Sequence, residues 1–235
     1  MEASGFDMDN VSDGKAVGDR KAVSDGKAIC DGKSVGDGKA ICDGKAVSDG
    51  KAMGDAADGR LRETVVSRMV VARGLAISYE RLLVELPGGA SAQRDVIRHP
   101  GGCGVVAVDA NGDVYLVRQH RVAIDKVTLE IPAGKLDAGE LPLDCAMREL
   151  REETGVTASE IREIACIYTT PGFCDEALHI FLATGLSRGD SDPDEGEFVE
   201  AVRMPLAQLA DMAMRGEIQD SKTVFGILYA ARAML

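Results

Sequence analysis

The sequence predicts an α/β fold in which a β-sheet is packed between helices, preceded by a low-complexity repeat. Past residue 60, patterns typical of short strands are followed by one helix, further strands and two final helices. This order favours a sheet covered by helices. Hydrophobic residues make up 45% of the 235 residues, which is enough to fill a core. We therefore expect a repeat tail over residues 1–59 and one folded domain over residues 60–235.

The repeat covers residues 13–54 and has a six-residue period, DGKAVG with close variants. Each unit offers one medium-sized apolar residue, which cannot offset the conformational entropy lost by ordering the other five. A left-handed β-helix also has period six and is the alternative, although it favours small or β-branched residues where this repeat has Lys. Disorder is therefore the expectation for this segment.

The net charge of −12 argues against nucleic acid as a partner, because binding to phosphates needs clustered Lys and Arg. The same charge is compatible with a site that gathers carboxylates around divalent cations. It is equally compatible with an ordinary acidic surface, so charge alone does not separate the two interpretations.

No membrane contact is expected, because no apolar run approaches the length that spans a bilayer. The N-terminal residues MEASGFDMDN show neither an apolar nor an Arg-rich targeting segment. The six cysteines form no CxxC pair and have no spacing typical of a zinc site. A cytoplasmic protein with free thiols is the simplest interpretation.

Strands are predicted in the first half of the folded domain. Residues 60–98 are rich in β-branched residues in alternation, with a break at Arg73-Gly74. Residues 103–121 predict a hairpin whose turn contains Asn111-Gly112, a pair suited to positive φ. Residues 127–132 predict a further strand that Pro132 ends.

A helix is predicted over residues 141–155, because Leu143, Ala146, Met147 and Leu150 recur along one face and Gly155 follows as a stop. That face is expected to pack on the sheet. Two more strands are predicted at 161–170 and 177–186. Two helices follow at 204–218 and 221–235, and the first should begin at Pro205.

Three carboxylates share one side of the predicted helix, since Glu149, Glu152 and Glu153 stand at positions i, i+3 and i+4. Like charges this close repel, and divalent cations held by oxygen ligands would compensate. Arg148 can orient a neighbouring Glu by a bidentate contact. A solvated acidic face is the alternative for such a cluster.

The spacing around these carboxylates is highly specific. Residues 134–156 match the pattern GX5EX7REUXEEXGU, where U is a bulky apolar residue, at Gly134, Glu140, Arg148, Glu149, Leu150, Glu152, Glu153, Gly155 and Val156. A chance match is on the order of one in a billion per starting position. The segment resembles the box of the Nudix hydrolase family. The resemblance implies a Nudix-type α/β/α sandwich with a mixed β-sheet.

The surrounding residues resemble the ADP-ribose or ADP-sugar pyrophosphatase branch of that family. The similar segments are TLEIPAGKLDAGE before and into the box, VRQHR in the preceding strand, and DEGEFVEAVRMPLAQL further on. The resemblance implies Mg²⁺-dependent hydrolysis of the diphosphate bond of ADP-ribose or a related nucleoside-diphosphate sugar, giving AMP and a sugar phosphate. The alternatives are another Nudix substrate (GDP-mannose, UDP-glucose or NADH) and a non-catalytic nucleotide-binding sensor module.

The resemblance also implies roles for individual residues. The metal ligands would be Glu149, Glu152, Glu153 and the backbone carbonyl of Ala133, holding Mg²⁺ or alternatively Mn²⁺. The general base would be Glu197 in the late acidic loop, with Glu195 as its neighbour, or Glu153 within the helix. Glu140 is expected to support the loop and helix geometry. The implied catalytic residues are therefore Glu197, Glu153 and Glu152.

Substrate contacts are implied at Arg121, Tyr79 and Pro171. The planar guanidinium of Arg121 suits a phosphate or the terminal ribose, with a surface salt bridge as the alternative. Pro171 stands sixteen residues beyond Gly155, where a proline marks this branch. Adenine in this branch is often stacked between aromatics that are contributed across a dimer. The chain has no Trp, so Tyr79 is the nearest candidate in the N-terminal strands.

A homodimer is expected from the resemblance and from the strand-rich segment 60–98. His99 and His120 are expected to be structural. Cys145 and Cys166 are expected to be core thiols.

Overall fold

A computed structural model describes residues 59–189 and 198–235. The repeat at 13–54 and the acidic-loop residues Glu195 and Glu197 lie outside the described residues. In chain order the elements are β1 (Thr64–Arg73), β2 (Ser78–Glu85), β3 (Ser91–Arg98), β4 (Gly102–Val108), β5 (Asp113–Arg121), β6 (Lys126–Glu130), β7 (Ala133–Lys135), α2 (Pro142–Thr154), β8 (Val156–Tyr168), β9 (Ala177–Arg188), β10 (Val199–Pro205), α3 (Leu206–Met214) and α4 (Ser221–Met234).

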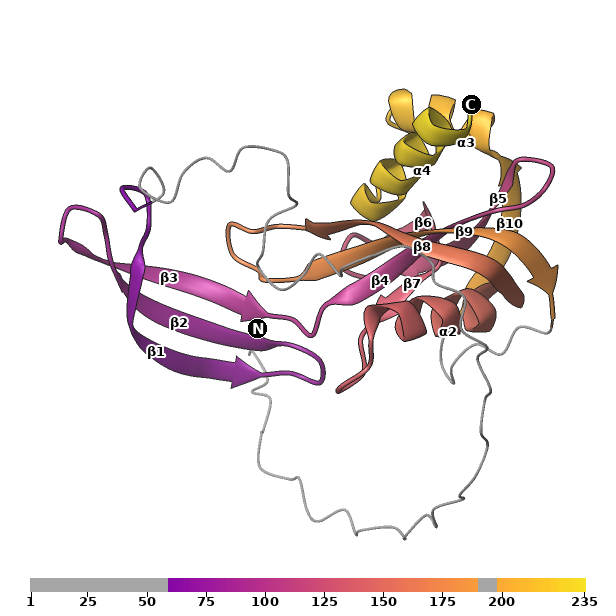
Figure 1. Ribbon diagram of the computed structural model, residues 1–235. Helices are drawn as coiled ribbons and strands as arrows, with labels where there is room; N and C mark the ends of the chain where they lie inside the picture. The colour runs from indigo at the N-terminus through magenta and orange to yellow at the C-terminus, as the bar shows by residue number, and fades with distance from the viewer. Residues whose placement is uncertain (1–58, 190–197) are drawn as a thin grey trace, which may run out of the picture. The chain divides into compact units, whose positions relative to one another are not determined.

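The central sheet contains seven strands, with the order β10-β5-β4-β9-β8 and with β6 paired to β5 and β7 paired to β4. Strands β4 and β9 run parallel, whereas the other pairs are antiparallel. The sheet is therefore mixed. Helix α2 lies along one of its faces, and α3 and α4 lie on the other (Figure 1). The predicted α/β class, with a mixed sheet between helices, is confirmed.

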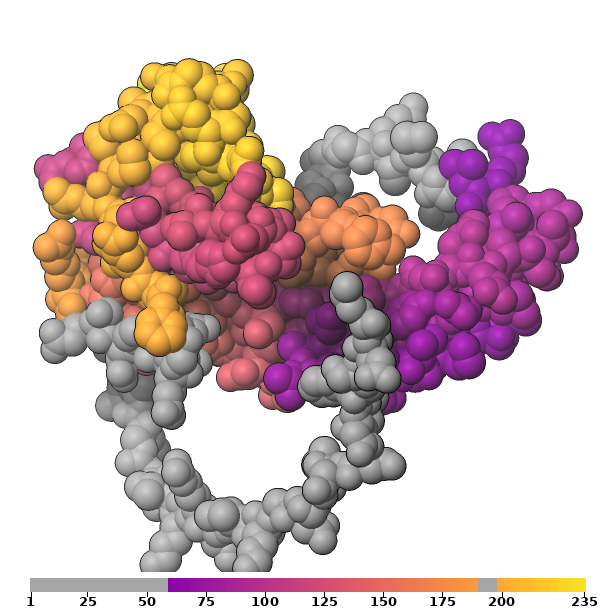
Figure 2. Space-filling view, turned by 180° about the vertical axis from the view of Figure 1, so that it is seen from behind, coloured from indigo at the N-terminus to yellow at the C-terminus, as the bar shows by residue number. Residues whose placement is uncertain are grey.

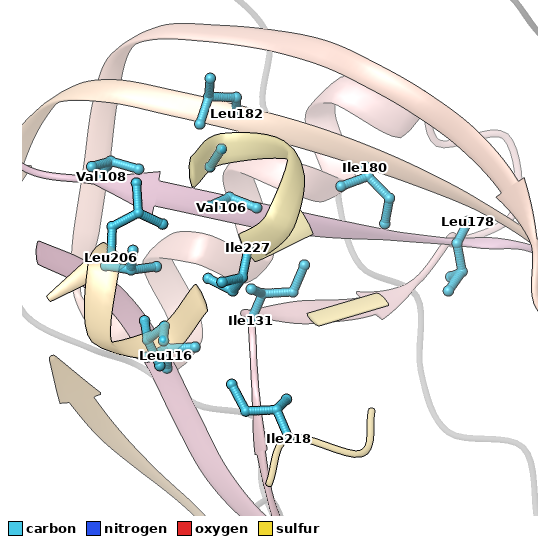
Figure 3. Close-up of a cluster of buried hydrophobic side chains, with 13 residues drawn as sticks. Val106, Val108, Leu116, Ile131, Leu178, Ile180, Leu182, Leu206, Ile218 and Ile227 are labelled. Atoms are coloured by element: carbon cyan, nitrogen blue, oxygen red, sulfur yellow. The ribbon is translucent and has the colours of Figure 1, made fainter. Parts of the chain in front are cut away.

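The alternation of side chains along the strands divides the core into two layers. On the α4 side, Val106, Ile131 and Ile180 pack with Ile227 in one buried cluster. Figure 3 shows Ile227 close to Val106 and Ile131. The other layer contains side chains of opposite parity from β4 and β9, packed against Ala146 and Leu150 of α2. Both faces of the sheet are thus covered, which explains the continuous burial of β4.

The hairpin between β4 and β5 is confirmed, and its turn has a different basis from the expected one. Of the two turn residues Asn111 and Gly112, only Gly112 adopts a positive φ, which is 80°. The Asp109 carboxylate instead accepts the Asn111 N–H, and the Gly112 N–H donates to the Asp109 carbonyl. This is the geometry of an Asx-stabilised turn that ends in a left-handed Gly. Only the C-terminal end of β4, at Ala107 and Val108, pairs with β5, whereas its first three residues, 102–104, pair with β7.

Helix α2 corrects one expectation about its buried face. Ala146 and Leu150 are buried as predicted, but Leu143 and Met147 are 41% and 44% exposed. The face turned to the sheet is instead completed by Cys145, Glu149 and Glu153. The helix is rotated so that two of its acids face inward, and two of its apolar residues are left at the surface.

The N-terminal strands form a separate three-stranded antiparallel sheet, β1-β2-β3. All ten residues of β1 are exposed, although Val66, Met69 and Val70 are apolar. Residues of β1, indigo in Figure 2, are visible at the molecular surface. Within the part of the chain that the structure describes, β1 is therefore an edge strand with exposed apolar side chains.

Within the described residues, no helix combines the length and the apolar character that crossing a membrane requires.

Replacing Gly226 of α4 by Ala should destabilise the fold. The added Cβ would lie 2.6 Å from Cγ2 of the fully buried Val106, so the core must shift. Such overpacking costs about 1–3 kcal/mol, which exceeds the helix propensity gained by replacing Gly. Thermal unfolding followed by circular dichroism should show a lower Tm for G226A. The control is G88A, at a position where the added Cβ has no heavy atom within 4 Å. An unchanged or higher Tm for G226A would contradict this packing argument.

Candidate active site

A cavity of about 600 Å³ opens where the end of β5, the β7 loop, helix α2 and the first turn of α4 meet. One wall is acidic and carries Glu149 and Glu153 of α2. A second group of lining residues includes the cations Arg121 of β5 and Lys222 of α4. These elements are far apart along the chain, so the cavity exists only because the sheet brings them together.

The acidic wall is formed by two buried carboxylates, with Glu149 at 8% and Glu153 at 4% exposed. One oxygen of Glu153 accepts the backbone N–H of Ala133 at 2.9 Å. Burying a carboxylate is costly unless its oxygens are hydrogen-bonded or neutralised. The loop after β6 therefore holds Glu153 in place, and both acids line the cavity.

Gly134 is required by the position of Glu149. A Cβ built on Gly134 would lie 1.7 Å from Oε1 of Glu149, with no room for both atoms. The carboxylate thus occupies the space that any side chain at this position would fill. This contact gives a physical reason for the glycine that begins the sequence pattern.

Arg148 holds the acidic residues of the loop and helix together. Its Nε and Nη2 donate to the two oxygens of Glu140 at 2.9 and 3.0 Å, which is a bidentate pair. Its Nη1 donates to Glu149 at 2.7 Å and to Glu152 at 3.2 Å. Hydrogen bonds with Glu140 and Glu149 raise the pKa of Arg148. The expected orienting role of Arg148 therefore agrees with its contacts.

Glu140 connects the loop to the helix. It accepts the Asp137 N–H at 3.0 Å in addition to its pair with Arg148. The hydrogen bond from Arg148 lowers the pKa of Glu140 to about 2. These contacts are those of a residue that supports the loop geometry.

The second group, with Arg121 and Lys222, is arranged around Glu130, which is 2% exposed. Nε and Nη2 of Arg121 donate to its two oxygens at 2.7 and 2.6 Å. Thr128 donates at 2.6 Å, and the Lys222 ammonium is a further partner. Burial alone would raise the pKa of Glu130, but the bonds from Arg121 and the charge of Lys222 outweigh it and lower the pKa to about 2.

The comparisons with known proteins agree on one family. The NUDIX domain model matches residues 98–224. The chain is 39% identical over 171 residues to ADP-ribose pyrophosphatase of Bacillus subtilis (strain 168), covering 72% of this chain and 92% of that protein. It is 37% identical over 167 residues to ADP-ribose pyrophosphatase of Mycobacterium tuberculosis (strain ATCC 25618 / H37Rv), covering 69% of this chain and 80% of that protein.

The chain belongs to the Nudix family. A crystal structure of an ADP compounds hydrolase superimposes with a TM-score of 0.65 over 74% of this chain and 95% of that chain. At 23% identity it supports the Nudix fold alone. The sequence pattern at residues 134–156 is therefore a Nudix box, and α2 is the Nudix helix.

Nudix hydrolases depend on divalent metal ions, and the donors at the acidic wall suit such an ion. Carboxylate and backbone oxygens are the ligands that Mg²⁺ prefers. Glu149 and Glu153 line the cavity beside the backbone of Ala133 and Gly134, and Glu152 lies one helical turn from Arg148. Across the described ranges, no three acid, His or Cys side chains are gathered into a ready metal cage. Arg148 instead bonds to Glu149 and Glu152.

The structure brings together some of the expected site residues and separates others. Arg121, Ala133, Glu149 and Glu153 line the cavity. Glu152 is partly buried and does not line it. Pro171 is exposed, while the two residues before it, Thr169 and Thr170, line the cavity. Tyr79 lies on β2 with its hydroxyl bonded to Arg81, away from the cavity. Glu197 is outside the described residues.

Several residues at the cavity were not predicted as site residues, among them Glu130, Asp220, Ser221 and Lys222. Asp220, Ser221 and Lys222 stand at the start of α4 and line the cavity. Asp220 caps that helix by accepting the Thr223 N–H at 3.0 Å. The sequence contains this capping pattern, but nothing in it indicates that the helix begins at the site. Glu130 belongs to the segment TLEIPAG, where its neighbours alone do not reveal its partners.

The thiols and histidines follow the expectations with one exception. Cys145 is buried 3.0 Å from the thiol of Cys103. The hydrogen bond with Cys103, together with burial, raises the pKa of Cys145 and keeps it protonated. Cys166, expected in the core, is only partly buried because it lies on the outer strand β8. His99 accepts the Gly101 N–H and lines the cavity, whereas His120 is exposed beside Asp125.

Replacing Gly134 by Ala should weaken metal binding. The new Cβ must displace the Glu149 carboxylate, and disturbing the support of a metal ligand typically lowers affinity about 10- to 100-fold. Isothermal titration with Mg²⁺ would measure the change. The control is G172A, because a Cβ at Gly172 meets no heavy atom within 4 Å. A wild-type Mg²⁺ affinity in G134A would show that metal binding does not depend on the Glu149 carboxylate lying beside residue 134.

Proposed function

We propose that this Nudix chain hydrolyses the diphosphate bond of ADP-ribose or a related nucleoside-diphosphate sugar, with Mg²⁺, giving AMP and a sugar phosphate. The observation that carries the proposal is the cavity, because two buried box carboxylates and an arginine line the same space, which is large enough for a small ligand. The named activity of the two similar pyrophosphatases supports ADP-ribose as the leading substrate.

The metal would be held by Glu149, Glu152 and Glu153 with the Ala133 carbonyl. When bound, it supplies positive charge that offsets the diphosphate oxygens and makes a neighbouring water molecule more acidic. Arg148 keeps Glu149 and Glu152 aligned through hydrogen bonds from its Nη1. The Ala133 N–H fixes one Glu153 oxygen.

The proton of the attacking water would pass to a carboxylate. Glu197 and Glu153 are the two candidates for the general base, and Glu152 is the neighbouring carboxylate on the helix. Glu153 is favoured by its burial beside the cavity. Glu197 is favoured by the resemblance of its acidic loop to that of the pyrophosphatase branch.

Arg121 would bind a phosphate group, since it lines the same cavity as the acids and two of its nitrogens are already fixed by Glu130. Among the described residues that line the cavity there is no Phe or Tyr. Stacking of adenine would therefore need an aromatic from elsewhere, and we propose Tyr79 of a second copy. Pro171 would shape the loop that carries Thr169 and Thr170.

We further propose a homodimer, formed through the N-terminal sheet, in the cytoplasm and without nucleic acid as a partner. The exposed apolar side chains of β1 support the interface. An unpaired apolar edge strand on a stable protein is usually covered by a partner.

Glu153→Gln should reduce turnover without unfolding the protein. Loss of a positioned acid–base group lowers kcat by about 10²- to 10⁴-fold. AMP release from ADP-ribose with Mg²⁺ would be compared among wild type, E153Q, E152Q and E197Q. The matched control is E160Q, an exposed carboxylate on β8.

A larger kcat loss in E197Q than in E153Q would assign the base to Glu197. GDP-mannose, UDP-glucose and NADH would be assayed in parallel, and a preference for one of them would move only the substrate assignment. If wild type turned over none of these substrates, the hydrolase proposal would be wrong, and binding of ADP-ribose alone would support the sensor interpretation.

Sedimentation at micromolar concentration should show a dimer, and V66E should shift it to the monomer. Val66 is 58% exposed on β1, so a charge there should disturb an apolar interface and not the core. The KM for ADP-ribose should rise in the monomer if Tyr79 acts across the interface. A wild-type monomer with full activity would refute the dimer.

A further inference from the structure

The Glu130 carboxylate is fully occupied by hydrogen-bond donors. Oε1 accepts from Nε of Arg121 and from the Thr128 hydroxyl, and Oε2 accepts from Nη2 of Arg121 and from Lys222. A carboxylate has about four lone-pair positions, and all are used here. Glu130 is therefore a fixed anchor, and it has no oxygen position left for a metal or a substrate.

Among the described residues, the hydrogen bonds of the Arg121 guanidinium are made by one of its edges. Nε and Nη2 of Arg121 donate to Glu130. The Arg121 side chain as a whole is 42% exposed and lines the cavity, and Nη1 forms the other edge of its guanidinium. A planar guanidinium that is fixed on one edge presents the other in a defined direction. This is the geometry needed to receive a phosphate oxygen.

Lys222 is buried at 7% exposure and donates to Oε2 of Glu130, the oxygen that also accepts from Nη2 of Arg121. Its ammonium also lies 3.0 Å from Asp220. The first turn of α4 is fixed to the end of β6, because the Ile131 N–H donates to the Thr223 hydroxyl at 2.9 Å. Lys222 thus reaches Glu130 from a rigid position.

The charges explain why a second cation is present. Arg121 and Lys222 together balance Glu130 and Asp220. If Lys222 were lost, Arg121 would be the one cation left among these four residues. Glu130 and Asp220 would then compete with a substrate phosphate for the positive charge of Arg121. The cavity already contains the acids Glu149 and Glu153, so an additional negative charge would repel a diphosphate.

We propose that Lys222 is a positioning residue, which acts through the Glu130 carboxylate to keep the Arg121 guanidinium directed into the cavity for a phosphate group of the substrate. This role rests on the proposed hydrolysis of a nucleoside-diphosphate sugar. Lys222 itself would not contact the reacting atoms, so its loss should affect KM far more than kcat.

The test is a double-mutant cycle between positions 121 and 222. With ADP-ribose and Mg²⁺, K222M should raise KM about tenfold on the wild-type background, whereas on the R121M background it should change KM less than about twofold. K222R should restore most of the affinity because it keeps the cation. K126M, which replaces an exposed Lys on the neighbouring strand β6, is the matched control. An equal KM effect of K222M on both backgrounds would overturn the proposal.

A second measurement does not depend on turnover. The ¹⁵N–¹H signal of the Arg121 Nε group, assigned by its loss in R121M, reports the bond to Glu130. K222M should shift this signal and K126M should leave it unchanged. An unshifted signal in K222M would overturn the proposal even if wild type proved inactive, which separates this failure from failure of the proposed function.

If K222M does not fold, E130Q/K222M replaces it, because this pair of changes leaves no unpaired buried charge at either position. The double variant should regain a cooperative thermal transition while its KM stays high, since Arg121 has lost its anchor. A wild-type KM in this folded variant would show that neither Glu130 nor Lys222 positions Arg121.

Discussion

The contact between the carboxylates of α2 and the turn at Ala133 and Gly134 is the constraint on which the site depends. Glu153 accepts the Ala133 N–H, and Glu149 fills the space beside Gly134. Two buried carboxylates so close together are unfavourable unless each is satisfied. The Ala133 N–H and the Arg148 guanidinium provide that satisfaction. The Nudix helix is consequently attached to the sheet by its polar residues as well as by Ala146 and Leu150.

This attachment determines the rotation of the helix. With Glu149 and Glu153 turned inward, Leu143 and Met147 face outward. A helix whose most apolar stripe faced the core would place its acids in solvent, where they could not line a cavity. Lining the cavity with acids and burying the most apolar stripe of α2 thus require different rotations of the helix. The hydrogen bonds of the buried acids stabilise the rotation that places them at the cavity.

The cavity has walls of opposite character, and each is stabilised separately. The acidic wall depends on local contacts within the box, between the loop and the helix. The cationic wall depends on Glu130, whose partners Arg121 and Lys222 come from a strand and from the last helix. A ligand with a diphosphate and bound metal ions would complement both walls at once, since it carries charges of both signs.

The sequence by itself determined most of the strand and helix order, without β7 and β10, together with the stop at Gly155, the start of α3 after Pro205 and the spacing of the box. These depend on side-chain periodicity, on backbone preferences of Gly and Pro, and on residues within a few turns of one another. The positions of Glu149 and Glu153 on one helix face follow from spacing alone. The role of Gly134 beside Glu149 did not, because it needs the approach of two elements.

Only the tertiary structure decided which face of α2 is buried, that α4 begins at the cavity, and that Lys222 meets Glu130 across 92 residues of sequence. Such pairings arise from how helices pack on the sheet, and no local pattern encodes them. The same holds for the direction of Arg121, which the sequence left open between a surface salt bridge and a substrate contact. The buried carboxylate that fixes it becomes its neighbour only when β5 and β6 pair.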